Sequence, residues 1–545
     1  MGTSSDANWE GENAFDGKNI VSQLEHAITS PSEDSQTAWQ CIRANPKVCL
    51  WTLWANSKQD APFVSQFDTN RNVVGSIMIG YENLALSVCL AMPAFQMTFA
   101  SEINGVMLIP AYWQSLWNAM YTVMNIVGSV AAGPIQDCFG RRAIFLTTII
   151  VASTGIAIAY VSETPAMYLG AKLLVGFALG ASMVGTQTFV SEIAPLPMRG
   201  IALSINTICL NCGLLIAISV TFSRIAIIDP SAFRLVFAAA WVFPGGLLIG
   251  LPFVPESPYW LVMKDKPAKA RASLVRLSNP SEDIDARLLA IQHTIALERQ
   301  QQAESGSFIE CFKGTNRRRT FITLACFYIS LAVGSVLSAN SPYFLNQAGL
   351  SSSTVLAITQ VGVSLGVLSS IVNIFLMMKF NHRPLIFFGV GVCILAYLTM
   401  GIAGAMKRTE TTMLVVGIAL QFSTLSYGPS VGAAMAVAGE VSATRLRAKT
   451  LALGSGFLGV AGTFWQSVLP YLYNSDQADL GGNLGWIFFG IAVIYLAILY
   501  FCVPGTKGRT YEELDGMFEA NIPARAFEGY RTEQAMRIDV ERTES

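Results

Sequence analysis

Long apolar runs dominate the chain and recur at short intervals from residue 73 to residue 503. A helix that crosses the hydrocarbon layer of a bilayer needs about 20 mostly apolar residues. The runs therefore predict an all-α membrane protein with twelve transmembrane helices, near residues 73–95, 112–132, 143–161, 166–190, 201–222, 234–254, 320–345, 354–378, 384–404, 411–436, 450–473 and 485–503.

Composition supports this prediction. Hydrophobic residues make up 52% of the 545 residues and charged residues 13%, whereas soluble domains carry about 25% charged residues. Such a chain has too few polar groups to cover a surface that faces water. It is therefore not a soluble enzyme, a nucleic-acid binder or a disordered protein. The net charge is −1, so the chain has no overall positive charge that would attract a polyanionic partner.

Catalytic and metal-binding patterns are not expected. Most of the ten cysteines lie in apolar runs, and the three histidines are scattered, so neither a disulfide framework nor a metal site is predicted. The sequence offers no phosphate-binding glycine loop and no nucleophile–histidine–acid set. We therefore expect a protein that is not an enzyme and has no cofactor.

The lysines and arginines indicate the orientation. They gather in the loops after the second, fourth, sixth, eighth and tenth spans, and cytoplasmic loops are the ones enriched in these residues. Both termini are predicted to be cytoplasmic, as an even number of spans requires. We expect a monomer in the plasma membrane.

The spans divide the chain into five segments. They are a polar cytoplasmic segment at 1–72, a six-helix bundle at 73–254, a cytoplasmic linker with short helices at 255–319, a second six-helix bundle at 320–503 and a cytoplasmic tail at 504–545. Four charged residues between 56 and 72 place that stretch outside the bilayer. A genuine loop and an insert from an incorrect gene model both remain open for it.

The two bundles repeat each other. Glu192 and Arg199 stand in an E-x6-R pattern after the fourth span, and Glu440 and Arg447 repeat it after the tenth. The prolines at the ends of the sixth and twelfth spans are separated by almost as many residues as Glu192 and Glu440 are. A parallel repeat of six-helix halves is typical of transporters with a binding site between the halves.

Five segments carry a resemblance to a known family. They are GPIQDCFGRR at 133–142, SEIAPLPMRG at 191–200, PESPYWL at 255–261, GEVSATRLRAKT at 439–450 and PGTKGRTYEELD at 504–515. Across about residues 73–518 the chain resembles the major facilitator superfamily, and within it the sugar porters, including fungal hexose and α-glucoside permeases. The resemblance implies the major facilitator fold and transport of sugars.

The resemblance also implies a charge network at the cytoplasmic ends of the helices. Ion pairs between the halves would break and reform as the halves rock, which biases the conformational equilibrium. Static salt bridges at helix ends are the alternative. The expected members of this cytoplasmic gate are Asp137, Arg141, Arg142, Glu192, Arg199, Glu256, Glu440 and Arg447.

Two charged residues lie inside predicted spans. Glu82 is near the middle of the first span and Lys172 is in the fourth, and such charges are costly and commonly functional. Proton-coupled sugar porters carry an acid at the position of Glu82 and usually an arginine where this chain has Lys172. The resemblance thus implies a proton-coupling pair. A structural carboxylate and a lysine that reaches the membrane surface are the alternatives.

The sugar-contact positions depart from the family. Its Gln-Gln-x-x-Gly-x-Asn pattern in the seventh span reads Ser-Leu-Ala-Val-Gly-Ser-Val at 330–336, so the pocket is expected to be less polar. Hydrogen bonding between helices is the alternative role for the polar residues that remain. The candidates for substrate binding are Asn206, Thr207, Asn211, Ser330, Asn340, Ser341, Tyr343, Gln421, Tyr427, Trp465 and Gln466.

Together these features predict a secondary transporter that takes up a sugar or glycoside with protons by alternating access. Export of a less polar secondary metabolite and a sugar sensor that does not transport remain alternatives. Substrate identity, direction and proton coupling stay open, and a bilayer, protons and a small molecule are the expected partners.

Overall fold

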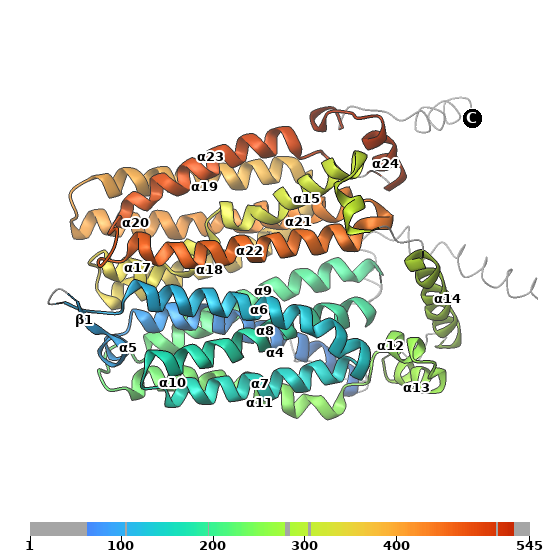
Figure 1. The fold of residues 1–545 in the computed structure, drawn as a ribbon, viewed down its shortest axis with the longest axis horizontal. Helices are drawn as coiled ribbons and strands as arrows, with labels where there is room; N and C mark the ends of the chain where they lie inside the picture. The colour runs from blue at the N-terminus through green and yellow to red at the C-terminus, as the bar shows by residue number, and fades with distance from the viewer. Residues whose placement is uncertain are drawn as a thin grey trace, which may run out of the picture. The chain divides into compact units, whose positions relative to one another are not determined.

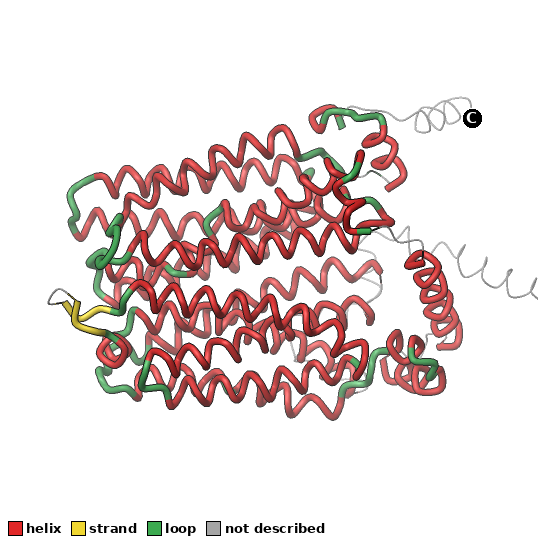
Figure 2. Tube along the Cα trace, in the orientation of Figure 1, coloured by secondary structure: helices red, strands yellow, loops and turns green. Residues whose placement is uncertain are grey.

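The computed structural model describes residues 63–103, 106–193, 196–277, 284–303, 307–507, 509 and 511–527. The described chain is almost entirely helical, with one two-stranded hairpin (Figure 2). The expectations for residues 1–62 and for the end of the tail lie outside the described residues.

Helices α4 to α11 form the first half of the molecule (Figure 1). Their length follows from apolar runs that favour burial or contact with lipid over contact with water. Their bounds are α4 Phe63–Leu90, α5 Pro93–Phe99, α6 Ala111–Phe139, α7 Arg141–Val161, α8 Pro165–Ile193, α9 Leu196–Phe222, α10 Ser231–Ala240, α11 Val242–Gly250 and the 3-10 turn Leu251–Phe253.

The first span differs from its prediction in two ways. Helix α4 begins at Phe63 rather than at residue 73, and the chain bends by 76° between Val74–Leu90 and Pro93–Phe99. Pro93 explains the bend, because proline supplies no N–H to continue the preceding helix. Strands β1 (Ser101–Ile103) and β2 (Val106–Leu108) then form an antiparallel hairpin. We call the hairpin's end of the bundle the hairpin end.

Three helices fill the described part of the linker, at the end of the bundle that we call the linker end (Figure 1). Leu274, Ile291 and Ile295 form their buried core. Arg271 donates to the Asp285 carboxylate at 2.8 and 3.0 Å, which lowers the pKa of that carboxyl below its ordinary value. The elements are α12 Pro258–Met263, α13 Pro267–Leu277, α14 Ile284–Ala303 and the turn Phe308–Phe312.

The second half and the tail follow the linker. The second half comprises α15 Gly314–Ala332, α16 Ser335–Ala339, α17 Ser341–Gln347, α18 Ser352–Lys379, α19 His382–Ala405, α20 Glu410–Phe422, α21 Tyr427–Val441, α22 Arg447–Tyr473 and α23 Leu484–Cys502, with 3-10 turns at Ser423–Ser426, Thr444–Leu446 and Gly481–Asn483. The tail contains α24 Tyr511–Glu519 and a 3-10 turn at Ala524–Ala526.

A glycine breaks the seventh span between α15 and α16. Gly334 has a φ of +76°, a left-handed conformation that is easy only for glycine. The break frees the carbonyl of Val333, which accepts a hydrogen bond of 2.8 Å from the Tyr397 hydroxyl. A Cβ at position 334 would overlap that hydroxyl. The span therefore consists of separate helical pieces.

Eight helical spans of the described residues are long and apolar enough to cross a membrane, and the bent pair α4–α5 makes nine. Large apolar side chains cover their outer surfaces, as expected where lipid is the solvent. Examples are Ile150, Val242, Ile249, Leu395 and Ile494. Helices α6 and α22 carry more polar residues, and they pack against each other between the halves (Figure 1).

Helices α4 and α9 cross at two glycines. A Cβ on Gly80 would overlap the carbonyl of Leu210, and a Cβ on Gly213 would overlap the carbonyl of Ile77. Small residues let membrane helices approach closely, and packing of this kind is what holds them together in lipid. Neither position leaves room for a side chain.

We predict that Gly80→Ala lowers the melting temperature of the purified protein by several degrees, because overpacking costs about 1–3 kcal/mol. Gly391→Ala in α19 is the matched control, since a Cβ there meets nothing within 4 Å. Thermal unfolding in detergent measures both variants. Equal melting temperatures would contradict the tight crossing.

Candidate functional site

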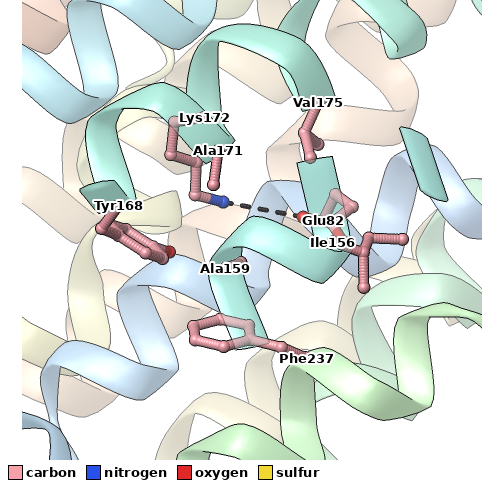
Figure 3. A pocket seen from close by; sticks show the side chains of 8 residues that line it. All are labelled: Glu82, Ile156, Ala159, Tyr168, Ala171, Lys172, Val175 and Phe237. Carbon is pink, nitrogen blue, oxygen red and sulfur yellow. Dashed lines mark ion pairs between the residues drawn. The ribbon is translucent and has the colours of Figure 1, made fainter. Parts of the chain in front are cut away.

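The two charges predicted inside the membrane lie together. Glu82 on α4 and Lys172 on α8 form an ion pair with 3.6 Å between Oε2 and Nζ (Figure 3). The two side chains are 6% and 5% exposed. The alternative in which Lys172 extends to the membrane surface is therefore wrong.

The surroundings of this pair are apolar and aromatic. Ile156, Ala159, Val175 and Phe237 line a small cavity beside it, together with Tyr168 (Figure 3). In such surroundings a charge is stable only with a partner, and removal of one partner typically costs 3–5 kcal/mol. The site thus holds one carboxylate and one ammonium group that stabilise each other away from water.

Aromatic rings hold the ammonium group of Lys172. Its Nζ lies 5.6 Å from the ring centroid of Tyr121 and 5.6 Å from that of Tyr168. A cation over a ring face gains about 0.5–2 kcal/mol, most where water is excluded. The Tyr121 hydroxyl donates to Asn83 Oδ1 at 2.7 Å. Tyr121 and Asn83 were not among the site residues expected from the sequence, although Asn83 directly follows Glu82.

The polar candidates for substrate binding fall into separate groups. The side chains of Asn206 and Thr207 on α9 lie outside the described residues. Asn211 on the same helix donates to Ser370 Oγ on α18 at 3.2 Å and so joins the halves. Tyr427 is 37% exposed.

An amide chain links the halves near the break in the seventh span. Asn118 on α6 donates to Asn340 Oδ1 at 3.3 Å, and Asn340 donates to Gln466 Oε1 on α22 at 3.2 Å. Asn340 and Gln466 were expected from the sequence, whereas Asn118 was not. An amide within the apolar run of the second span was the signal that could have found it.

The remaining candidates bond within the second half. Gln421 donates to Ser341 at 3.0 Å, and Ser330 donates to the carbonyl of Phe327 at 3.4 Å in its own helix. The Trp465 ring packs on Phe488 with the centroids 5.3 Å apart. The contacts of Gln421 and Trp465 match the alternative role, hydrogen bonding and packing between helices, and the role of these candidates in substrate binding stays a prediction.

A further set of contacts closes the hairpin end between the halves. Asp476, in the loop after α22, accepts from the backbone N–H of Ala111 at 3.2 Å. Asn474 donates to the carbonyl of Ile109 at 3.1 Å and accepts from the Tyr343 hydroxyl at 3.1 Å. Pro110 precedes α6 and has no side-chain acceptor, so the carboxylate of Asp476 caps the helix from the other half.

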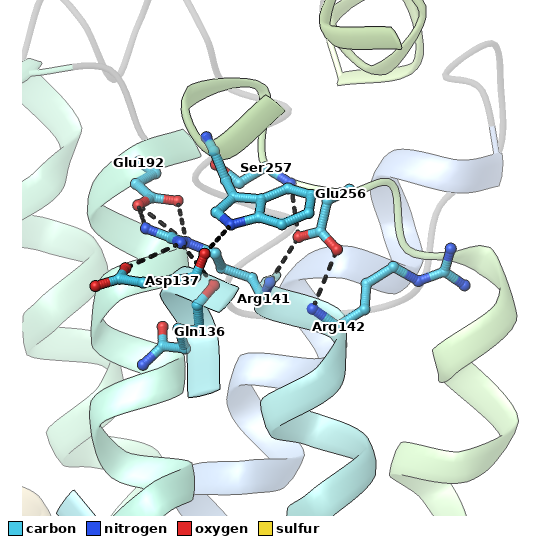
Figure 4. A network of polar contacts seen from close by, with 8 residues as sticks. Gln136, Asp137, Arg141, Arg142, Glu192, Glu256 and Ser257 are labelled. Carbon is cyan, nitrogen blue, oxygen red and sulfur yellow. Dashed lines mark hydrogen bonds and ion pairs between the residues drawn. The ribbon is translucent and has the colours of Figure 1, made fainter. Parts of the chain in front are cut away.

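Arg141 is the centre of the network at the linker end (Figure 4). Its guanidinium donates to Glu192 at 2.5, 3.1 and 3.2 Å and to the carbonyl of Gln136 at 3.1 Å. Asp137 lies 3.6 Å away and is mostly exposed. The forked geometry of arginine suits this pairing with a carboxylate, and lysine could not reproduce it.

Glu256 caps the start of α7. Its carboxylate accepts from the backbone N–H groups of Arg141 at 2.7 Å and Arg142 at 3.4 Å. Gly140 precedes the helix with a φ of +94°, and a Cβ there would lie 2.6 Å from Glu256 Oε2. The Trp260 indole donates to the carbonyl of Asp137 at 3.1 Å. The glycine, the arginines and the PESPYWL segment therefore form one structure.

The second half has a related pair. His382 Nε2 lies 3.5 Å from Glu440 Oε1. Glu192 and Glu440 thus each have a partner within their own half, and the expected ion pairs between the halves stay a prediction. The side chain of Arg199 lies outside the described residues, and Arg447 is the first residue of α22.

Comparisons with known proteins identify the family. Residues 71–518 match the family described as "Sugar (and other) transporter", and the chain belongs to this family. The "MFS transporter fmqE" of Aspergillus fumigatus is 30% identical over 504 residues, which cover 91% of this chain and 92% of that protein. The "General alpha-glucoside permease" of Saccharomyces cerevisiae is 26% identical over 530 residues, covering 95% of this chain and 83% of the permease.

Solved structures agree with this assignment. The xylose transporter XylE from E. coli, in a partially occluded inward open conformation, has a TM-score of 0.67 at 19% identity and covers 82% of this chain and 99% of its own. The proton:xylose symporter XylE bound to 6-bromo-6-deoxy-D-glucose has a TM-score of 0.63 at 19% identity and covers 83% of this chain and 99% of its own. The predicted twelve-helix major facilitator fold and the resemblance to sugar porters are confirmed. The chain is a multi-pass membrane transporter.

We predict that Arg141→Ala lowers the melting temperature strongly, because Glu192 then lies largely buried without its partner, at a cost of about 3–5 kcal/mol. Arg142→Ala should cost less, since its guanidinium donates to the carbonyl of Leu251. Thermal unfolding of both variants measures the difference. An equal or larger loss for Arg142→Ala would contradict the central place of Arg141.

We also predict that Asp476→Ala opens the hairpin end more often, because loss of a helix cap costs about 0.5–2 kcal/mol. A cysteine at Ser115, whose hydroxyl bonds the carbonyl of Ser467 across the halves, should then react severalfold faster with a thiol reagent that cannot cross membranes. Asp479→Ala is the control, since Asp479 pairs with Arg408 within the second half. Unchanged labelling would contradict the closure.

Proposed function

We propose that this member of the sugar transporter family takes up a sugar or glycoside together with protons, by alternating access between the two halves. The observation that carries the proposal is the ion pair of Glu82 and Lys172, buried in an apolar pocket with 3.6 Å between its charged atoms. A salt bridge that only stabilised the fold would not need to lie where the burial of charge costs so much free energy.

The chemistry of the pair suits proton exchange. When Glu82 is ionised, Lys172 balances its charge and the site is electrically neutral. When Glu82 binds a proton, Lys172 loses its partner and only the rings of Tyr121 and Tyr168 stabilise the ammonium. The two protonation states therefore favour different arrangements of α4 and α8, which is the requirement for coupling a proton to a conformational change.

The relatives support a sugar as the substrate. Proteins named alpha-glucoside permease and maltose permease align over most of this chain, and XylE is named a proton:xylose symporter. We assign substrate contact to Asn211 on α9, Asn340 between α16 and α17, and Gln466 on α22, which take part in the hydrogen bonds that join the halves. From the sequence alone we add Asn206 and Thr207.

The two ends of the bundle supply the gates in this proposal. The contacts of Asp476 and Asn474 with the start of α6 close the hairpin end, which we place outside the cell because the linker end carries the cationic loops. The networks of Arg141 and Glu440 act at the cytoplasmic end. The protein works as a monomer in the plasma membrane, with both termini in the cytoplasm.

We predict that Glu82→Gln abolishes uphill accumulation of sugar but retains exchange of labelled for unlabelled sugar, because the amide keeps the shape and cannot cycle a proton. Uptake of radiolabelled maltose, glucose and xylose in transporter-null yeast, with and without a protonophore, is the measurement. Glu163→Gln is the matched control, since Glu163 is an exposed acid.

Accumulation equal to wild type in Glu82→Gln would contradict the coupling role. Loss of accumulation in both variants would point to a general defect in folding or expression instead. Surface expression, followed by a fluorescent tag, corrects the uptake rates of all variants.

A further inference from the structure

We propose that Tyr121 is a positioning residue that links sugar binding between the halves to the proton pair of Glu82 and Lys172. The inference rests on the proposed function. It adds a specific route by which an occupied sugar site changes the surroundings of the proton site. Three contacts of the described residues carry it.

The first contact joins Tyr121 to an exposed amide. Its hydroxyl donates to Asn83 Oδ1 at 2.7 Å, and Asn83 is exposed while its chain neighbour Glu82 is buried. Successive residues of a helix point about 100° apart, so the two side chains face different surroundings. Asn83 faces the open side of α4, and Glu82 faces the interior of the first half.

The second contact joins Tyr121 to the cation. Its ring centroid lies 5.6 Å from Lys172 Nζ, and the ring of Tyr168 lies at the same distance. Tyr168 is fully buried, whereas Tyr121 is partly exposed. Of the two rings that hold the ammonium, Tyr121 is therefore the one within reach of a molecule between the halves.

The third contact places Tyr121 on the side of α6 that faces the second half. Asn118, three residues earlier and thus adjacent on the helix surface, bonds to Asn340 of the second half. Helix α4, which carries Asn83, also packs against α16 and α17 of the second half. The pair of Tyr121 and Asn83 consequently borders the space in which the proposed sugar contacts lie.

The hydrogen bond between Tyr121 and Asn83 is the contact that a bound sugar can change. A sugar hydroxyl that donates to Asn83 competes with the Tyr121 hydroxyl for the same oxygen. Displacement of Tyr121 moves its ring relative to Lys172 and changes how firmly the ammonium is held beside Glu82. Titratable groups around Glu82 in the described residues are Lys172 on α8, Tyr168 on α8, Tyr121 on α6, and Cys89 and Tyr81 on α4.

Tyr121→Phe separates the two contacts, since it removes the hydroxyl and keeps the ring over Lys172. We expect a severalfold higher KM for maltose or for the sugar that the uptake panel identifies, together with a shifted dependence of uptake on external pH. Tyr121→Leu removes the ring too and should also lower the ratio of protons to sugar taken up. Asn83→Ala should reproduce the effect of Tyr121→Phe.

Tyr160→Phe serves as the control, because Tyr160 is exposed and packs against Trp241 away from the proton pair. A uniform fall in rate for the Tyr121 variants, with the pH profile and proton-to-sugar ratio of wild type, would overturn the inference. If Glu82→Gln abolishes accumulation in that case, the proposed function still stands. If Glu82→Gln accumulates sugar normally, the proposed function itself fails.

Discussion

A charged or polar group removed from water is stable only when a hydrogen-bonding or ionic partner lies close to it. This constraint decides where the buried charged side chains of the molecule lie. Glu82 and Lys172 satisfy it with each other, inside a pocket of apolar and aromatic side chains. Arg141 satisfies it with Glu192 and a backbone carbonyl. The two residues of each pair lie on different helices. The pairs that stabilise the buried charges therefore also fix how these helices pack against each other.

Helix α6 shows the constraint at the boundary between the halves. A carboxylate from the loop after α22 caps its first turn, and Asn118 connects it to the second half. The helix after it, α7, starts under the carboxylate of Glu256 from the linker region. Most spans lie against lipid with apolar side chains, but α6 and α22 carry amides and hydroxyls because they face each other. The polar residues on α6 and α22 therefore identify a contact between the halves that has to open during alternating access.

Much of this could be predicted from residues alone. Apolar runs located the spans, and Glu82 and Lys172 were found because a charge within such a run needs an explanation. Tyr121, Asn118 and Asp476 were missed because their partners are far away in the chain, as Asn118 and Asn340 are. The partners of Glu192 and Glu440 could not be predicted, because the repeated motif gives the residue types without their distances. Their partners, Arg141 and His382, each lie in the same half as the glutamate that they contact.

The interruption at Gly334 affects how the seventh span can move. The segment before it, α15, is tied to the tail through Arg319 and Asp515. After it come Asn340, which bonds to Asn118 on α6, and Tyr343, which bonds to Asn474 at the hairpin end. A continuous helix would transmit any tilt along its whole length. Because the joint is left-handed and the Tyr397 hydroxyl bonds to the carbonyl beside it, we expect the outer piece to tilt without moving α15 or its contact with the tail.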